Sequence, residues 1–312
     1  MKALVTGGAG FIGSHLVEAL VARDAGVTVV DNLVTGTIDN LSSVADRVSF
    51  VRLDLTRDDL GTVLEAGQFD LIVHAAGNAN IPVSVSEPQR DFEDNALATL
   101  RLLESVRRSS AQPKIVNISS ATVYADTRGG PMTEKDPMDP VSPYGVSKLA
   151  AELYVKVYAQ LHGLRACSVR VFSVFGPRLR KQVVWDFMTR LSRDPANLTI
   201  RGDGTERRNP THVSNIVSAI LLTADKAEMR GEAYNIGSRD SVSIAELARD
   251  VAHAMGLDPD IEVAGHAQQG HARAWVADVT KLESMGYTPQ IGYHDGLRQT
   301  VEWFHSVHGE RS

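Results

Sequence analysis

The sequence predicts an α/β protein organised around a doubly wound parallel sheet, and two observations carry this prediction. In the first half of the chain, short apolar runs alternate with helical stretches, as they do where strands and crossover helices follow one another. The first strand–helix pair meets at a glycine-rich turn, Thr6-Gly-Gly-Ala-Gly-Phe-Ile-Gly13, and a helical pattern begins at Phe11. We therefore expect parallel strands with helices on both faces of the sheet.

The elements of this half follow in order along the chain. The apolar runs predict strands over residues 3–6, 28–31, 49–53, 71–74, 114–119 and 165–170. Helical periodicity predicts helices over residues 11–23, 58–65, 92–108 and 146–162. Each predicted helix falls between two predicted strands, as the crossover connections of a parallel sheet require.

After about residue 172 the pattern becomes less regular. Turns are expected at residues 175–177 and 201–204, a strand at 233–237, and helices at 184–192, 214–224, 244–254 and 296–305. We predict a larger, cofactor-binding domain over residues 1–172, to which 205–240 contributes. A smaller, partly interleaved substrate-binding domain is predicted over residues 173–312.

Composition and charge exclude several classes of protein. The 312 residues are 43% hydrophobic and 22% charged, as in ordinary globular proteins, and a net charge of −6 without a basic block argues against nucleic-acid binding. The single cysteine cannot form an internal disulfide, and no cysteine–histidine cluster has metal-ligand spacing. Neither a signal segment nor a membrane-spanning apolar run is found. We expect a cytoplasmic protein that uses no metal and binds no membrane.

The glycine-rich turn predicts a dinucleotide site. Gly7, Gly10 and Gly13 allow a tight turn, close approach of the backbone to a pyrophosphate, and close helix-on-strand packing. The helix that begins there directs its free N–H groups at the pyrophosphate. The second apolar run ends in Asp31, whose carboxylate can accept both hydroxyls of an adenosine ribose and would repel a 2′-phosphate. The turn alone is also compatible with glycine used for packing; together with Asp31 it predicts NAD rather than NADP.

Tyr144 and Lys148 form the candidate reactive pair. Residues four apart lie on one helix face, so the phenol and the ammonium group can reach one site. A lysine cation and a positively charged nicotinamide ring would stabilise the phenolate and lower the pKa of Tyr144. Ser119, Ser120 and Thr122 add hydroxyls at the end of a predicted strand, where a substrate would lie. The alternative is that the pair is solvated helix surface and that the hydroxyls serve strand-edge hydrogen bonds.

Ten segments of the chain carry a family resemblance. They are residues 6–13, 30–33, 54–55, 74–76, 95–103, 119–124, 142–148, 175–178, 202–204 and 234–237. In this order they resemble the extended short-chain dehydrogenase/reductases of the NAD-dependent sugar epimerase/dehydratase family, and among them the UDP-glucose 4-epimerases. The resemblance implies a Rossmann-type fold with bound NAD.

The resemblance also implies roles for single residues. Tyr144 would be the catalytic acid/base, Lys148 would hold the nicotinamide ribose, and Ser120 would bind the reacting sugar hydroxyl with Thr122 beside it. The implied NAD contacts are Gly7, Gly10, Phe11, Ile12, Gly13, Asp31, Asn32, Asp54, Leu55, Ala75, Ala76, Asn95, Tyr144 and Lys148. For Asp54 an equally good interpretation from the sequence is the N-cap of the helix predicted at 58–65.

Substrate contacts follow from the same resemblance. Arg208 and Arg273 match arginines that grip a substrate pyrophosphate, and Arg201 matches a residue that packs on the nucleotide base. Ser173, which would contact the substrate together with Ser120 and Tyr144, stands where the family commonly has asparagine beside the sugar phosphate. The alternative for the arginines is solvated surface charge.

The implied reaction is NAD-dependent epimerisation at C4 of a nucleotide-diphosphate sugar, of the UDP-glucose/UDP-galactose type, through a 4-keto intermediate. Ala121 and Thr122 stand where the family's 4,6-dehydratases carry an acidic pair, which argues against dehydration. The alternatives are another chemistry on a nucleotide sugar, such as uronate, N-acetylhexosamine or heptose epimerisation, decarboxylation, dehydration or ketoreduction, and a non-catalytic NAD-binding regulator.

The resemblance further implies a homodimer. The predicted helices over residues 92–108 and 146–162 carry apolar stripes, and members of the family pair these helices into a four-helix bundle across a two-fold axis. The alternative is that both stripes are buried against the chain's own sheet.

Overall fold

The computed structural model describes residues 1–124, 130–265 and 274–308 of the chain. The chain divides into two units. The first, here the sheet unit, comprises Met1–Ala125, Glu134–Val171 and Val217–Asn235. The second, here the C-terminal unit, comprises Asp126–Thr133, Phe172–Ile216 and Ile236–Ser312. The assignment of cofactor to one unit and substrate to the other stays a prediction.

A seven-stranded sheet forms the centre of the sheet unit, in the strand order β11-β6-β5-β4-β1-β2-β3. Its strands are β1 (Lys2–Thr6), β2 (Gly26–Asp31), β3 (Val48–Arg52), β4 (Leu71–His74), β5 (Lys114–Ser120), β6 (Ala166–Val171) and β11 (Arg230–Ile236). The pairings from β3 across to β6 are all parallel. The chain runs outward from β1 to β3 and then from β4 to β6 on the other side. The direction of winding therefore reverses between β1 and β4, which is where ligands bind in open α/β sheets.

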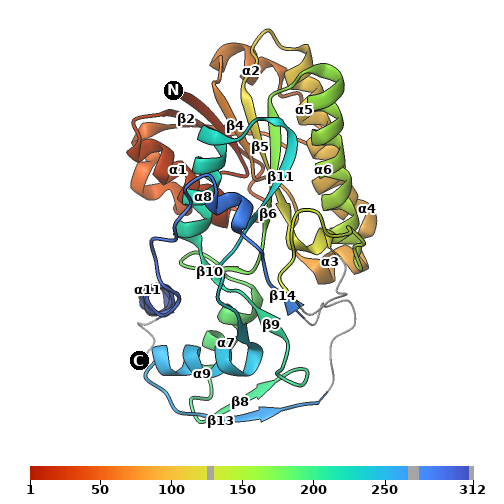
Figure 1. Cartoon of the computed structure of the whole chain (residues 1–312). Coiled ribbons are helices and arrows are strands. Elements are labelled where there is room, and N and C mark those ends of the chain that lie inside the picture. Colours follow the sequence, from red (N-terminus) through yellow and green to blue (C-terminus); the bar gives the residue numbers. More distant parts are fainter. Residues whose placement is uncertain (125–129, 266–273, 309–312) are drawn as a thin grey trace. The chain divides into compact units, whose positions relative to one another are not determined.

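Helices cover both faces of this sheet (Figure 1). One face carries α1 (Phe11–Ala22) and α8 (Val213–Lys226), and the other carries α2 (Gly61–Gly67), α5 (Ala98–Arg108) and α6 (Pro143–His162). Shorter elements are the 3-10 helix η1 (Ile38–Arg47), α3 (Ile81–Ser86), α4 (Pro88–Phe92), the π-helical turn η2 (Glu93–Leu97) and the 3-10 turn η3 (Ala121–Val123). The predicted doubly wound α/β fold is confirmed.

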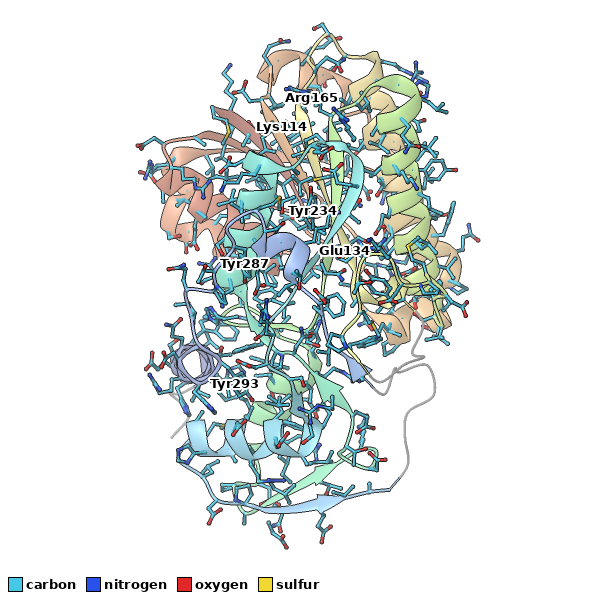
Figure 2. All side chains as sticks on the ribbon, viewed as in Figure 1. Lys114, Glu134, Arg165, Tyr234, Tyr287 and Tyr293 are labelled. Carbon is cyan, nitrogen blue, oxygen red and sulfur yellow. The ribbon has the colours of Figure 1, made fainter. Side chains whose placement is uncertain are left out.

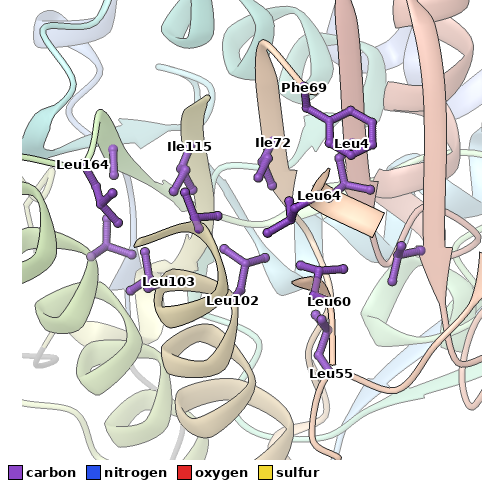
Figure 3. Packing of buried hydrophobic residues seen from close by; sticks show 14 of the residues in the cluster. Leu4, Leu55, Leu60, Leu64, Phe69, Ile72, Leu102, Leu103, Ile115 and Leu164 are labelled. Atoms are coloured by element: carbon purple, nitrogen blue, oxygen red, sulfur yellow. The ribbon is translucent and has the colours of Figure 1, made fainter. Parts of the chain in front are cut away.

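One hydrophobic core of the sheet unit lies between the sheet and the helices α2, α5 and α6. Leu4 and Ile72 from the strands meet Leu64 of α2 and Leu102 and Leu103 of α5 (Figure 3). All five side chains are buried. This packing stabilises the parallel sheet, in which the carboxyl ends of the strands lie along one edge.

A buried ion pair ties α6 to the strand next to it. Arg170 of β6 binds Glu152 of α6 through Nε at 3.1 Å, and both side chains are buried. The guanidinium also donates to the hydroxyl of Tyr124 and lies 4.8 Å from the centre of that ring. Tyr124 in turn donates to Asn235 of β11 at 2.8 Å. The backbone N–H of Asn235 donates to the side chain of Glu134, which is labelled in Figure 2. Because the charges of Arg170 and Glu152 are paired, these two side chains can stay buried at the end of the sheet.

The C-terminal unit has short strands and a separate core. Its strands are β7 (Val174–Phe175), β8 (Asn197–Ile200), β9 (Arg207–Arg208), β10 (Thr211–His212), β12 (Val242–Ser243), β13 (Asp260–Val263) and β14 (Ala274–Trp275). Its helices are α7 (Gln182–Leu191), α9 (Ile244–Ala254), α10 (Thr280–Glu283) and α11 (Tyr293–His308). Phe187, Leu247, Val251 and Phe304 from α7, α9 and α11 are buried together in this core.

Several predicted elements begin or end at other residues than expected; the helix expected over 296–305, for example, spans Tyr293–His308. The helix expected over 92–108 begins earlier, at Pro88, and η2 interrupts its α-helical geometry between Glu93 and Leu97. The helix expected over 58–65 begins only at Gly61, with Leu60 as its N-cap. The predicted carboxyl ends of the sheet strands lie within one residue of the observed carboxyl ends. Within the described residues, no helix is both long enough and apolar enough to cross a membrane.

Replacing Leu102 with Ala should leave a cavity in the core of the sheet unit. We expect the free energy of unfolding to fall by about 2–5 kcal/mol, measured by denaturant unfolding followed by circular dichroism. Ile38→Ala, at a half-exposed position of η1, is the control and should change it by about 0.5 kcal/mol or less. Wild-type stability in the Leu102→Ala protein would contradict this description of the core.

Candidate active site

The predicted cofactor residues gather at the carboxyl ends of neighbouring strands. Asp31 ends β2, Asp54 and Leu55 follow β3, and Ala75 and Ala76 follow β4. The turn after β1 lies among them, at the reversal of the strand order. The structure thus brings together residues that are far apart in the sequence, because parallel strands all end at the same edge.

The glycine turn after β1 is packed against the backbone that follows β4. A Cβ atom on Gly7, where φ is +68°, would lie 2.6 Å from the backbone nitrogen of Ala76. One on Gly13 would lie 2.1 Å from the carbonyl oxygen of Gly7. Gly10 is the N-cap of α1 and has no side chain to bond the N–H groups of Phe11 and Ile12 that follow it. The first turn of α1 therefore fits a pyrophosphate, which would accept those N–H groups.

Asp31 is fixed by backbone donors before any ligand binds. Its Oδ2 accepts the N–H of Ala9 at 2.9 Å, and its Oδ1 accepts the N–H of Leu33 at 2.8 Å. Each oxygen keeps lone-pair capacity for a ribose hydroxyl. Asn32, next in the chain, accepts the N–H of Val34 at 3.0 Å and so holds the turn behind Asp31. The residues present fit the adenosine ribose of NAD, and a 2′-phosphate would meet a carboxylate.

Asp54 is not a helix N-cap, and that interpretation of the sequence is wrong. Its Oδ1 accepts the backbone N–H of Thr56 at 3.0 Å and the Thr56 hydroxyl at 2.7 Å, while Oδ2 accepts Arg57 Nη2 at 2.8 Å. These bonds close a tight turn after β3, and α2 starts further along at Gly61. The other interpretation, that Asp54 and Leu55 flank adenine, stays a prediction.

Thr122 orients Ser120 toward Tyr144. The Ser120 Oγ accepts the backbone N–H of Thr122 at 3.2 Å and the Thr122 hydroxyl at 2.9 Å. Its own proton is therefore free to be donated, and the Tyr144 side chain lies near enough for Ser120 to affect its pKa. A hydroxyl that donates to the phenol oxygen favours the phenolate, so Ser120 lowers the pKa of Tyr144.

Gly145 lets the first turn of α6 approach the end of β5. A Cβ atom at this position would lie 2.4 Å from the carbonyl oxygen of Thr122. Ser142 caps the same turn by accepting the N–H of Gly145 at 3.2 Å, and Pro143 occupies the first helical position. The absence of a side chain on Gly145 thus allows the first turn of α6, which carries Tyr144, to approach η3 and Ser120.

Burial dominates the ionisation of the reactive pair. Burial, together with the negative charge of Asp91, raises the pKa of Tyr144 to about 12, against the effect of Ser120, which lowers it. Burial lowers the pKa of Lys148 to about 8, against the charges of Asp91 and Glu152, which raise it. With the chain's own groups alone, the pKa of Tyr144 is thus higher than the sequence led us to expect, since loss of hydration outweighs the effect of Ser120.

His74, at the end of β4, is a buried structural histidine. The Thr99 hydroxyl donates to the carbonyl oxygen of Asn95 at 2.7 Å, so it accepts from His74 Nε2 at 3.0 Å. His74 Nδ1 is then the unprotonated nitrogen and accepts the Thr6 hydroxyl at 2.7 Å. Burial, with the charge of Lys148, lowers the pKa of His74 to about 3. A neutral His74 on β4 therefore links β1, through Thr6, to α5, through Thr99.

Asn95 and its neighbour Asp91 form a polar cluster that the sequence only partly indicated. Asn95, predicted to contact NAD, lies in the π-helical turn η2 and is buried. Asp91, four residues earlier and also buried, was not predicted, although i,i+4 spacing places both on one helix face. π-helical turns occur frequently at functional sites.

The predicted substrate residues Ser173, Arg201 and Arg208 belong to the C-terminal unit. Ser173 precedes β7 and accepts the N–H of Thr211 through its backbone oxygen. Arg201, after β8, is exposed. The Arg208 guanidinium lies 4.9 Å from the centre of the Trp275 ring. Their role in substrate binding stays a prediction.

Arg273 lies outside the described residues, so its predicted contact with the substrate also stays a prediction. Among the described residues, no group of three or more histidine, cysteine, aspartate or glutamate side chains is placed to hold a metal ion.

Comparisons with known proteins identify the family of the chain. The model of the NAD-dependent epimerase/dehydratase family matches residues 3–237. The chain is 32% identical over 311 residues to the UDP-glucose 4-epimerase of Mycolicibacterium smegmatis, covering 97% of this chain and 98% of that protein. It is 32% identical over 314 residues to the dTDP-glucose 4,6-dehydratase of Streptomyces niveus, covering 97% and 93%.

A solved structure extends the comparison to three dimensions. The UDP-glucose 4-epimerase of Thermus thermophilus in complex with NAD has a TM-score of 0.90 at 34% identity, covering 98% of this chain and 100% of that one. The chain belongs to the NAD-dependent epimerase/dehydratase family, within the extended short-chain dehydrogenase/reductases that modify nucleotide-diphosphate sugars. The predicted family and the predicted cofactor, NAD, are confirmed.

Gly13→Ala should weaken NAD binding about tenfold or more, because its Cβ atom would overlap the Gly7 carbonyl oxygen and open the turn. The measurement is the NAD released from purified protein on denaturation, with circular dichroism as the test of folding. Gly26→Ala is the matched control, since a Cβ atom there meets no heavy atom closer than 4.0 Å. Full NAD content in the Gly13→Ala protein would contradict the proposed place of the pyrophosphate.

Proposed function

We propose that this protein is an NAD-dependent epimerase that inverts C4 of a UDP-hexose, interconverting UDP-glucose and UDP-galactose. The observation that carries the proposal is the placement of Tyr144 beside Ser120, two proton-carrying groups at the cofactor edge of the sheet, with Ser120 oriented by Thr122. The relatives support it, since both the Mycolicibacterium smegmatis protein and the Thermus thermophilus protein are UDP-glucose 4-epimerases.

In the proposed mechanism, Tyr144 removes the proton of the C4 hydroxyl as that carbon is oxidised, and later returns it. Ser120 has a single hydroxyl proton, which it can donate either to the Tyr144 oxygen or to the C4 oxygen of the substrate as the proton moves between them. Lys148 holds the nicotinamide ribose, and its positive charge stabilises the phenolate. When bound, NAD+ supplies the redox chemistry by taking a hydride from C4 and giving it back.

Inversion requires the 4-keto sugar to present its other face before reduction. We assign Arg208 and Arg273 to the pyrophosphate, because guanidinium groups bind such oxygens in bidentate fashion and can anchor the nucleotide while the sugar turns. Arg201 is assigned to the base and Ser173 to the sugar. Net oxidation over the cycle is zero, so NAD stays bound and needs no external reductant. A cytoplasmic location stays a prediction of the sequence.

Dehydration is the second candidate, because one relative is a dTDP-glucose 4,6-dehydratase. Removing water across C5 and C6 needs an acid/base partner beyond the tyrosine. Ala121 carries no such group, and the Thr122 hydroxyl is already donated to Ser120. These two residues favour epimerisation. The presence of Tyr144, Lys148 and Ser120 together favours an enzyme over a regulator without turnover.

Tyr144→Phe should abolish turnover while leaving bound NAD unchanged, since the phenylalanine ring fills the same space without the proton. We expect kcat to fall by about 100-fold or more. The assay incubates purified protein, without added NAD, with UDP-glucose, UDP-galactose, their uronates and their N-acetylhexosamines, and follows mass and absorbance. Tyr154→Phe, on the exposed side of the same helix, is the control.

Each result of this assay decides a different point. Interconversion of one C4 pair by the wild type supports the epimerase and identifies the sugar. Loss of water or carbon dioxide, or accumulation of NADH, would replace it with another nucleotide-sugar chemistry. Normal turnover by Tyr144→Phe would remove Tyr144 from the mechanism.

We also propose a homodimer through α5 and α6. Val146, Leu153, Val157 and Leu161 follow one another at spacings of seven, four and four along α6, and all are exposed, Leu161 by 74%. An apolar stripe of this length needs a partner surface. In contrast, Leu103 of α5 is buried against the chain's own sheet. A second copy of the same helices would cover the stripe and give a closed two-fold interface.

Leu161→Glu should convert the dimer to a monomer, because it places a charge in the apolar stripe. The molecular mass in solution, from light scattering after size-exclusion chromatography, is the measurement. Val307→Glu, at an exposed position of α11, should leave the mass unchanged. A monomeric wild type, or a dimeric Leu161→Glu protein, would argue against this interface.

A further inference from the structure

Asp91 is a buried carboxylate next to the reactive pair of Tyr144 and Lys148. It is not among the site residues that the sequence or the family resemblance predicts. Asp91 of α4 is 1% exposed and accepts three hydrogen bonds from three separate segments. Its Oδ1 accepts Nδ2 of Asn78 at 2.9 Å and Nδ2 of Asn95 at 3.1 Å, and its Oδ2 accepts the hydroxyl of Ser147 at 2.6 Å. All three donors are neutral, so the carboxylate is held by hydrogen bonds and not by an ion pair.

The carboxylate fixes which way both amides face. An ionised aspartate only accepts hydrogen bonds, so Asn78 and Asn95 must each turn their NH2 group toward it. The Oδ1 of Asn78 then accepts the backbone N–H of Asn80 at 3.0 Å. The Oδ1 of Asn95 is buried and bonds to none of the described residues. This oxygen faces Gly77, which lies on the loop that follows Ala75 and Ala76. A Cβ atom on Gly77 would be only 2.5 Å from it.

Ser147 connects the same carboxylate to the catalytic turn of α6. It lies between Tyr144 and Lys148 in the sequence, and its Oγ is 3.0 Å from the carbonyl oxygen of Tyr144 as well as 2.6 Å from Asp91. Asn95 Nδ2 also donates to Ser147 at 3.2 Å. The turn that carries both reactive side chains is thus bonded to α4 through one buried acceptor.

We propose that Asp91 is a positioning residue, which holds the Tyr144–Lys148 turn in place through Ser147 and presents the Asn95 Oδ1 as an acceptor for a hydroxyl of the bound cofactor. This inference rests on the proposed function, in which that turn does the proton transfer. Asp91 itself touches neither cofactor nor substrate.

The charge of Asp91 gives the role a measurable signature. Other ionisable groups around the pair are Glu152 of α6, which is paired with Arg170, and the neutral His74 of β4. Asp91 raises the pKa of both Tyr144 and Lys148, because a negative charge favours the protonated form of each. Removing that charge should therefore move both ionisations to lower pH.

Asp91→Asn in the NAD-loaded protein is the first test. With its amide oxygen toward Asn78 and Asn95, an asparagine places its NH2 group opposite Ser147, so the Ser147 hydroxyl loses its acceptor there and the link from α4 to α6 is weakened. We expect kcat for the interconversion of UDP-glucose and UDP-galactose to fall about 100-fold, as small misplacements of catalytic groups can cause. The KM and the NAD content should stay within about twofold, and the pH profile of kcat should move to lower pH.

Two further variants separate positioning from general damage. Asp94→Asn removes a charge from the same helical segment, where Asp94 pairs with Arg90, and should leave kcat and its pH profile unchanged. Ser147→Ala removes the link to α6, and with it one acceptor of Asn95 Nδ2, and should lower kcat about tenfold. Because Ser147 acts through Asp91, adding Ser147→Ala to Asp91→Asn should cause little further loss.

The proposal is overturned if Asp91→Asn keeps the wild-type kcat and pH profile, or if its loss and that of Ser147→Ala are fully additive. Should Asp91→Asn not fold, wild-type kcat in Ser147→Ala overturns it equally. If the wild type does not act on either UDP-sugar, the proposed function has failed, and the ionisation of Tyr144 still decides this inference. Measured at 295 nm against Tyr144→Phe in each background, it should occur at lower pH in Asp91→Asn than in wild type, and an unchanged value overturns the inference.

Discussion

The contact between the first turn of α6 and the end of β5 is the constraint on which the site depends. Gly145 allows it, because any larger residue would strike the carbonyl oxygen of Thr122. The same approach brings Tyr144 within reach of Ser120, whose proton Thr122 leaves free by donating to it twice. One close backbone contact thus decides the geometry of proton transfer.

The rest of the sheet unit supports that contact. The core beneath α5 and α6 aligns the strands, so that the glycine turn and Asp31 face the same edge as Ser120. Burial raises the pKa of Tyr144 to about 12. The protein alone therefore keeps the phenol protonated near neutral pH, and the cationic cofactor and the charge of Lys148 have to favour the phenolate. This arrangement would link proton removal to the presence of bound NAD+.

Local residue patterns were enough to predict the strands, the glycine turn and Asp31, because these depend on hydrophobic periodicity and on single-residue backbone preferences. They failed at the helix expected over 58–65, since Asp54 bonds to Thr56 and closes a turn of its own. The contacts of Asp91 could not be predicted from the sequence, for a different reason. Its partner Ser147 is 56 residues away, and only the packed fold places a buried acceptor between the two.

Isotope transfer tests the central claim of C4 inversion most directly. Purified protein without added NAD is incubated with UDP-glucose that carries deuterium at C4, and the UDP-galactose formed is analysed by mass spectrometry and NMR. The account predicts that the deuterium is retained at C4 of the product, because the hydrogen removed there is returned to the same carbon. Exchange of the label with solvent, or a product that has lost water, would contradict it.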